Sequence, residues 1–429
     1  MIGIGIIGLG TVGTGTYKIL KEHFALIKHR TGLHIEVVKI ADIDLKRRKG
    51  LTIEKGIFTS NALDVINDRK VHIVVELIGG INPAYDYILS AIKQGKWIVT
   101  ANKALLAEKW DKLFNVAARH NCEIGFEASV CGGIPVIRAI REGLVGNRIL
   151  YILGILNGTS NYILSRMTDE GMSFNDALQE AQRLGIAEQD PTLDIEGIDA
   201  VHKLCILTRL AFHSPIKVND IIRDGISRIE PIDIGFAKEF GYKIKLLAVA
   251  KERNDTIEAR VEPAMLPVDH PMSNVNGVYN ATYVVGDMTG PNLYYGKGAG
   301  AEPTGSAVVS DIVDMALRMR EGRKTPIISV SMVEKKIRSG EESRVPYYIR
   351  FNAQDRPGVL SKISGILAKY NISISAVIQK GRKESGHVPI VMLTHEAIEK
   401  NLKQAKREIN KLPVIKGESV HIRIEEGML

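Results

Sequence analysis

Cysteine is scarce in this sequence of 429 residues, which has only Cys122, Cys131 and Cys205 and no Cys-x-x-Cys pair. An odd number without such a pair provides no disulfide framework, and predicts a reducing compartment. No apolar stretch approaches the ~20 residues that a membrane span needs. The apolar start, residues 1–10, lacks the basic region of a signal peptide. We therefore expect a soluble, cytoplasmic protein.

Long runs of one charge are also missing. Lys and Arg exceed Asp and Glu by 57 to 49, a net charge of +8, but the charges are interspersed and only Lys46–Lys49 forms a short basic run. No basic stripe interleaved with aromatic residues appears, which argues against nucleic acid as a partner. A modest positive charge suits phosphorylated cofactors and anionic substrates. The length predicts two or three domains.

The N-terminal third alternates apolar strands with helical segments. Strands are expected at Ile2–Ile7, His34–Ile40, Val71–Leu77, Trp97–Thr100 and Cys122–Val130. Strands that are apolar along their whole length and separated by helices predict a parallel sheet covered on both faces. We therefore expect an α/β, Rossmann-like domain at residues 1–130.

A Gly-x-Gly-x-x-Gly pattern at Gly8–Gly13 stands between the first strand and the first helix, where a dinucleotide-binding fingerprint belongs. Gly8 would allow the tight turn, Gly10 the approach of the pyrophosphate and Gly13 close packing of helix on strand. The alternative is a purely structural glycine turn. Cofactor choice stays open, since the second strand is followed both by acids that suit NAD and by bases that suit NADP. These are Asp42 and Asp44, and Lys46, Arg47 and Arg48.

A helix is expected from Glu196 to Phe212, and it places Asp199 and Lys203 at i,i+4 on one side. Such a pair is commonly a surface salt bridge worth ~0.3–0.5 kcal/mol. Here Glu188 and Asp194 precede it, and the rest of the helix is apolar enough to be buried. Carboxylates and an ammonium at the mouth of a buried helix suit a substrate with an α-amino group and a reducible carbonyl. The sequence thus favours an oxidoreductase.

After about Arg320 polar stretches mark another boundary. From Tyr347 the pattern reads strand, helix, strand, strand, helix, strand, which predicts a small ferredoxin-like sheet.

Taken together, the motifs over residues 1–320 resemble homoserine dehydrogenase. The stretches that carry the resemblance are Gly8–Gly13, Val99–Lys103, Glu127–Val130 with Gly132–Pro135, Gly158–Tyr162, Glu188–Lys203, Gly298–Gly300 and Pro303–Val309. The resemblance implies NAD(P)H-linked interconversion of L-aspartate 4-semialdehyde and L-homoserine, a step of threonine, methionine and isoleucine biosynthesis. It also implies a homodimer or homotetramer with a dimerising sheet in an α+β catalytic domain at 131–320, and a helix near 302–320 that returns to the first domain.

The resemblance further implies individual roles. The catalytic residues are Lys203, Asp199 and Lys103, of which either lysine could be the proton donor, and the substrate-binding residues are Glu188, Asp194, Thr159 and Gly158. Cofactor-binding residues are Gly8, Gly10, Thr11, Val12, Gly13, Arg48, Thr100, Lys103 and Gly300. The carbonyls of Glu127, Val130, Gly132 and Ile134 match a sodium or potassium loop. Three positions depart from the family: Cys131 replaces a common glycine, Leu193 a frequent acid, and Ile186 an occasional tyrosine.

Residues 346–429 resemble an ACT domain, with Asp355–Gly358 at its usual ligand-binding turn. This implies amino-acid sensing, with threonine as the expected effector; a purely dimerising module is the alternative. Two other functions stay open for the whole chain: a dehydrogenase of another amino-acid-like carbonyl, and a non-catalytic amino-acid sensor.

Overall fold

The structure is a computed structural model that describes residues 1–44, 46, 50–54, 56–322, 332–380 and 386–426. Its contacts divide the chain into two interleaved compact units. Unit 1 contains residues 1–158, 199–221 and 278–335, and unit 2 contains residues 159–198, 222–277 and 336–429. Among the described residues, no helix is both long and apolar enough to cross a membrane.

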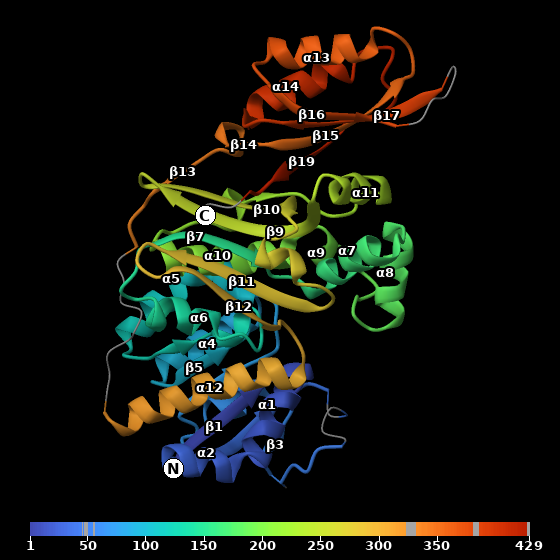
Figure 1. Cartoon of the computed structure of the whole chain (residues 1–429). Helices are drawn as coiled ribbons and strands as arrows, with labels where there is room; N and C mark the ends of the chain where they lie inside the picture. Colours follow the sequence, from blue (N-terminus) through green and yellow to red (C-terminus); the bar gives the residue numbers. More distant parts are fainter. Residues whose placement is uncertain (45, 47–49, 55, 323–331, 381–385, 427–429) are drawn as a thin grey trace. The chain divides into compact units, whose positions relative to one another are not determined.

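Unit 1 begins with a parallel sheet whose strand order is β3-β2-β1-β4-β5-β6 (Figure 1). This is the order of a doubly wound dinucleotide-binding fold. The central strands are buried along their length, so the chain needs apolar residues at every position rather than at alternate ones. The strands are β1 (Ile2–Ile7), β2 (Ile35–Ala41), β3 (Phe58–Thr59), β4 (Ile73–Glu76), β5 (Trp97–Thr100) and β6 (Ile124–Gly125). The helices between them are α1 (Thr11–Glu22), α2 (Phe24–Thr31), α3 (Ala62–Ile66), α4 (Ala84–Lys93) and α5 (Lys103–Arg119).

Of the strand expected over Cys122–Val130, only Ile124–Gly125 lies in the sheet, and the rest of the prediction is wrong. The chain leaves the sheet after Gly125 and forms the short 3-10 helix η2 (Glu127–Ser129). Two hydrogen bonds favour this turn: the Glu127 amide donates to Asp311 Oδ2 at 2.8 Å, and the Ser129 hydroxyl donates to the Phe126 carbonyl at 2.6 Å. The edge strand β3 was not expected.

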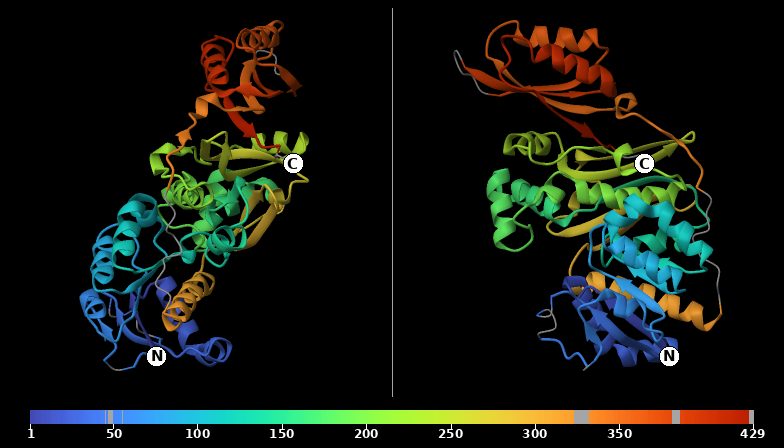
Figure 2. Two further views of the ribbon diagram at one scale, coloured as in Figure 1. Left: turned by 90° about the vertical axis from the view of Figure 1, so that its left-hand side faces the viewer. Right: turned by 180° about the vertical axis from the view of Figure 1, so that it is seen from behind.

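A late helix returns to the first domain. α12 (Ala301–Arg320) packs on α1, and both views of Figure 2 draw it beside the N-terminal helices. A Cβ on Gly15 would lie 2.0 Å from the Ala301 carbonyl oxygen, so glycine is required at this crossing. The expected returning helix is confirmed.

The remainder of unit 1 carries α6 (Val136–Arg138), the π-helical turn η3 (Ala139–Gly143) and the buried helix α10 (Ile198–Phe212). It also contains an antiparallel sheet with β7 (Ile149–Ile155) beside β11 (Tyr279–Gly286), and β11 beside β12 (Gly290–Lys297).

Unit 2 is built on an antiparallel hairpin of β9 (Tyr242–Arg253) and β10 (Thr256–Pro267). From β10 the sheet continues through β19 (Val420–Ile424), β15 (Tyr347–Gln354), β17 (His387–Thr394) and β16 (Ile374–Gln379). β8 (Ile222–Arg223) and β13 (Lys336–Ile337) also pair with β10. The helices before the hairpin are α7 (Gly158–Glu170), α8 (Phe174–Arg183), α9 (Thr192–Ile195) and α11 (Pro231–Glu239).

The C-terminal part of unit 2 confirms the expected βαββαβ order, with α13 (Val359–Lys369) and α14 (Glu399–Ile409). Both helices cover an apolar core that includes Tyr347, Phe351 and Ile363. The expected ferredoxin-like architecture is therefore present.

Candidate functional site

The glycine loop follows β1 directly and leads into α1. Gly8 has a φ of 99°, in the region that glycine reaches without strain. A Cβ on Gly13 would lie 2.0 Å from the Gly8 carbonyl oxygen, so glycine is required there too. Gly10 is the N-cap residue of α1, which has no side-chain cap. The first-turn amides, which include those of Thr11 and Val12, are thus suited to an anion such as pyrophosphate.

Asp42 fastens this loop to the end of β2. Its Oδ2 accepts a hydrogen bond from the Leu9 amide at 2.6 Å, and its Oδ1 accepts one from the Asp44 amide at 2.8 Å. Lys46, four residues after Asp42, is exposed, whereas Arg47 and Arg48 lie outside the described residues.

Two neighbouring strands end in a buried polar pair, in which Thr100 is a predicted cofactor residue and Glu76 was not predicted. Thr100 at the end of β5 donates from Oγ1 to Glu76 Oε2 at 2.7 Å, and Glu76 at the end of β4 accepts from the Ile78 amide at 2.9 Å. Burial raises the pKa of Glu76, and its hydrogen bonds partly offset that rise. The sequence feature that could have identified Glu76 is an acidic residue near the end of an otherwise apolar strand. Carboxyl ends of such strands are where this fold binds ligands.

The strongest polar constellation joins three residues from two helices. Asp199 lies in the first turn of α10; its Oδ1 is 2.7 Å from Lys103 Nζ, at the start of α5, and its Oδ2 is 2.7 Å from Lys203 Nζ. Lys203 Nζ also donates to the Leu156 carbonyl at 2.6 Å, and Asn157 Nδ2 donates to Asp199 Oδ2 at 3.0 Å. The structure thus brings together all three predicted catalytic residues and adds Asn157, which was not predicted as a site residue.

Burial separates the two lysines. Asp199 and Lys203 are buried, whereas the Lys103 side chain is 41% exposed. Burial by itself raises the pKa of Asp199, but the two ammonium groups outweigh it and hold that pKa well below its usual range. Asp199 therefore stays ionised and serves as an anchor for both cations.

The predicted substrate residues Thr159, Glu188 and Asp194 belong to unit 2. Thr159 Oγ1 donates to the Ile186 carbonyl at 3.1 Å, and Ser160 Oγ donates to the Asp194 carbonyl at 2.8 Å. The Glu188 side chain is exposed and that of Asp194 half-buried. Gly158 lies in unit 1, where a Cβ would meet the Val278 carbonyl oxygen at 2.7 Å.

The loop over 127–134 is tightly turned and, apart from Gly133, buried. Both Glu127 carboxylate oxygens accept amides of α6, from Ile137 and Arg138 at 2.9 Å each. Cys131 has a φ of 56° and Gly132 a φ of 46°. A left-handed backbone at Cys131 gives the physical reason why glycine is favoured at this position. Its buried thiol, whose pKa burial raises, packs 3.7 Å from Thr282 Oγ1.

Other predicted positions are placed by the same parts of unit 1. Gly300 is the N-cap residue of α12, with a φ of 123°. The carbonyl of Ile134 accepts the Val136 amide at 2.8 Å, and Val130 is fully buried. In the part of the chain that the structure describes, no group of three His, Cys, Asp or Glu side chains could hold a metal.

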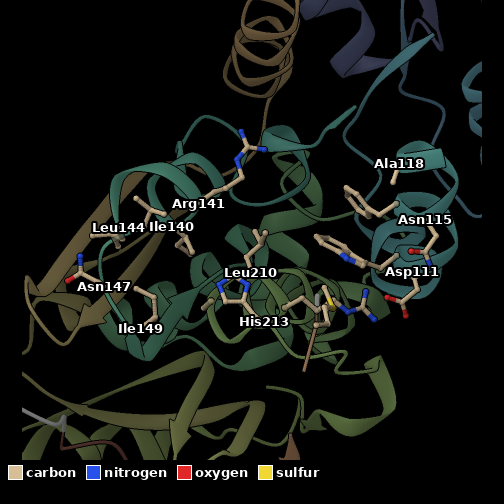
Figure 3. Close-up of a pocket in the computed structure, with 16 residues that line it drawn as sticks. Asp111, Asn115, Ala118, Ile140, Arg141, Leu144, Asn147, Ile149, Leu210 and His213 are labelled. Carbon is tan, nitrogen blue, oxygen red and sulfur yellow. The ribbon is translucent and has the colours of Figure 1, made fainter. Parts of the chain in front are cut away.

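A cavity of about 560 Å³ in unit 1 is lined by other residues (Figure 3). It lies between α5, η3 and the end of α10, and its lining includes Trp110, Arg141 and Leu210. Arg209 also lines it, and its guanidinium donates to the Leu106 carbonyl at 3.0 Å. Arg209 thus ties α10 to α5, which fixes the two helices that carry Asp199 and Lys103.

A doubly wound sheet with a glycine loop, a carboxylate held between two lysines and a C-terminal ferredoxin-like module define an NAD(P)-dependent dehydrogenase with an appended ACT domain. Three family matches agree: the homoserine dehydrogenase NAD-binding domain over residues 8–127, homoserine dehydrogenase over 135–313, and the ACT domain over 347–414. The chain belongs to the homoserine dehydrogenase family.

Several homoserine dehydrogenases are similar to nearly the whole chain. A homoserine dehydrogenase of Helicobacter pylori is 45% identical over 428 residues, 99% of each chain. One of Neisseria gonorrhoeae is 42% identical, over 99% of this chain and 98% of its own. The crystal structure of a homoserine dehydrogenase from Thiobacillus denitrificans is 45% identical, covers 99% of this chain and 98% of its own, and has a TM-score of 0.94. A hyperthermophilic archaeal homoserine dehydrogenase, solved in complex with NADPH, has a TM-score of 0.63 at 29% identity and covers 74% of this chain and 98% of its own.

Proposed function

We propose that the chain reduces L-aspartate 4-semialdehyde to L-homoserine, and the reverse, with Lys203 as the proton donor and Asp199 as its anchor. The observation that carries this is the Asp199 carboxylate, buried and held 2.7 Å from each of two ammonium groups. Reduction of an aldehyde leaves an alkoxide that must be protonated or held by positive charge. Lys203 can do either, and Asp199 together with the Leu156 carbonyl fixes its position.

Lys103 is the second candidate for the proton. Its greater exposure lets it exchange protons with water, and it begins α5 directly after the cofactor-side strand β5. Asp199 anchors both lysines through different oxygens. Separate variants of the two lysines therefore distinguish a proton donor from a group that orients substrate.

Gly8, Gly10, Thr11, Val12 and Gly13 would form the cofactor loop, in which the close approach of Gly13 to the Gly8 carbonyl packs the helix on the strand and leaves Gly10 and the first-turn amides to hold the pyrophosphate. When bound, the nicotinamide supplies the hydride. Thr100 and Gly300 lie at a strand end and a helix start, where they would contact the cofactor. We propose acceptance of NADP, since the Asp42 carboxylate already binds the Leu9 and Asp44 amides and basic residues follow it. The NADPH complex of the archaeal relative supports this proposal.

Glu188, Asp194 and Thr159 would contact the amino and carboxylate groups of the substrate, with Gly158 allowing close approach. The carbonyls of Glu127, Val130, Gly132 and Ile134 would bind sodium or potassium. Neutral carbonyl oxygens suit a hard monovalent cation, and a carbonyl already bonded to one amide keeps a second lone pair. Replacing sodium and potassium chloride by choline chloride should lower both the activity and the melting temperature.

The ACT domain would bind threonine at Asp355–Gly358, where Gly358 has a φ of 84° and begins α13. A full chain that threonine inhibits, beside a chain ending near Arg338 that it does not, would support this proposal. Equal inhibition of both would place threonine in the active site. No inhibition of either would leave the domain as an assembly module within a homodimer or homotetramer.

Consumption of NADPH with L-aspartate 4-semialdehyde tests the reaction, with NADH run beside it. A panel of other amino-acid-like carbonyls separates a related dehydrogenase. If the chain binds NADPH but reduces neither L-aspartate 4-semialdehyde nor any other carbonyl compound of the panel, it is a non-catalytic sensor with the fold of a dehydrogenase.

A further inference from the structure

Unit 2 contains a second cavity, of about 330 Å³, which we name the junction cavity. Its walls come from the segment 224–230, from β10 at Glu262 and Pro263, from Lys406 on α14 and from residues 418–423 around β19. The cavity thus lies where the C-terminal module meets the hairpin of the same unit. Its volume is at the lower end of ligand sites in proteins, about 300–1,000 Å³.

Some of the charges around the junction cavity are already neutralised. Arg423 Nε lies 3.0 Å from Glu262 Oε1, and Arg423 Nη2 lies 3.2 Å from Glu399 Oε2. Glu230 pairs with Arg350 at 3.2 Å. These ion pairs form the fixed part of the wall.

The remaining charges are two cations and two anions. Arg228 and Lys406 provide the positive charge, and Asp224 and Glu418 the negative charge. Arg228, Asp224 and Glu418 are exposed, whereas Lys406 is half-buried and its ammonium lies 3.1 Å from His421 Nδ1. Burial lowers the pKa of Lys406 and Glu418 raises it; the charge of Arg228 lowers it again, while Asp224 and Glu399 raise it. A carboxylate bound near Arg228 and Lys406 would relieve their repulsion.

We propose that the junction cavity binds a small free α-amino acid. Its carboxylate is bound by Arg228 and Lys406, and its ammonium by Asp224 and Glu418. A ligand with both charges matches this wall better than a simple anion, which the two carboxylates would repel. The short apolar walls, Ile229 and Pro263 among them, fit a small aliphatic side chain.

The wall of the junction cavity is hydrogen-bonded to the substrate segment of unit 2. The Ile226 amide donates to the Ile195 carbonyl at 2.9 Å, and Ser227 Oγ donates to Glu196 Oε1 at 3.0 Å. Ile195 ends α9, which contains the proposed substrate residue Asp194. An occupant that binds both the 224–230 wall and α14 would therefore stiffen α9. Such coupling requires only that the ligand favours one arrangement of this wall.

Calorimetric titration of the full chain with glycine, L-alanine, L-threonine and L-valine tests the binding site without any catalytic readout. We expect at least one of them to bind, with affinity at least tenfold lower in Arg228→Ala and in Lys406→Met. Arg407→Ala is the matched control, because Arg407 is a neighbouring α14 residue outside the cavity lining, and it should bind normally. N-acetyl-L-threonine, which lacks the ammonium, should bind at least tenfold more weakly than L-threonine.

Four outcomes would overturn the proposal. These are no binding of any of the four amino acids, binding unchanged in both cavity variants, tighter binding of inorganic phosphate, or equal binding of the N-acetyl compound. Arg228 is exposed, so its variant should fold even if Lys406→Met does not. Asp355→Asn should leave this binding intact, which separates the junction cavity from the proposed threonine turn. Hydrogen exchange of the α9 amides should slow with ligand bound, and unchanged exchange would refute the coupling.

Discussion

Replacing Lys203 by alanine removes an ammonium that binds two acceptors, the Leu156 carbonyl and Asp199 Oδ2, at 2.6 and 2.7 Å. A positioned proton-transfer group contributes about 10²–10⁴-fold to the rate. We therefore expect kcat to fall by that factor, which corresponds to about 2.7–5.5 kcal/mol of barrier at 1.36 kcal/mol per tenfold. Affinity for NADPH should change little, since the glycine loop is untouched.

The structure also predicts how the rest of the site responds. In Lys203→Ala the buried Asp199 carboxylate keeps Lys103 and Asn157 as partners, so the anchor stays ionised and the fold should survive. Lys203→Met preserves most of the side-chain volume and controls for loss of packing. Asp199→Ala should lower kcat less than Lys203→Ala, because both lysines remain.

The assay is steady-state NADPH oxidation with L-aspartate 4-semialdehyde, together with direct NADPH binding by fluorescence. Lys103→Ala is the matched comparison, since it removes the other ammonium on the same carboxylate. If Lys203→Ala keeps near-normal turnover while Lys103→Ala is inactive, the proton role belongs to Lys103 and our reasoning from burial is wrong.

Three further predictions concern other parts of the chain. Gly10→Val should weaken NADPH binding while the melting temperature is retained, because its side chain enters the pyrophosphate site; unchanged affinity would mean that the loop is not the phosphate site. Burial raises the pKa of Asp311 to about 7 from 3.8, so this carboxyl stabilises the fold in acid and its contribution is lost as pH rises from about 4 to 7. Asp311→Asn should therefore be more stable than the wild type at pH 8, by at most about 4 kcal/mol at ~1.4 kcal/mol per pKa unit. At pH 4 the two proteins should have similar free energies of unfolding, which urea unfolding measures. Equal free energies of unfolding of the variant and the wild type at both pH values would contradict the assignment. A chain ending at Lys335 should still turn over, because Lys103, Asp199 and Lys203 and their hydrogen-bond partners all precede that point; loss of NADPH oxidation with L-aspartate 4-semialdehyde in the truncated chain would contradict this.

Local pattern was enough to predict much of the fold. Apolar strands at short spacing gave the parallel sheet, the glycine pattern gave the loop before α1, and helical spacing placed Asp199 and Lys203 one turn apart on α10. The order of the C-terminal module could also be read, because each of its elements has its own periodicity.

Contacts between residues far apart in the sequence could not be predicted from local patterns. Asn157 donates to Asp199 only because β7 ends beside α10. A contact between residues 42 positions apart cannot be predicted from the local sequence pattern of either segment. The buried pair of Glu76 and Thr100 depends on the adjacency of β4 and β5. The strand expected through Val130 failed because Asp311, on a helix far along the chain, supplies the hydrogen bond that favours a turn.

The most direct test of the account follows the hydride itself. NADPH deuterated at its transferable position is incubated with the full chain and L-aspartate 4-semialdehyde, and the product is analysed by mass spectrometry. We expect homoserine that carries the deuterium, formed in step with NADPH oxidation and nearly abolished in Lys203→Ala. Homoserine without deuterium, or no homoserine while NADPH binds normally, would contradict this expectation.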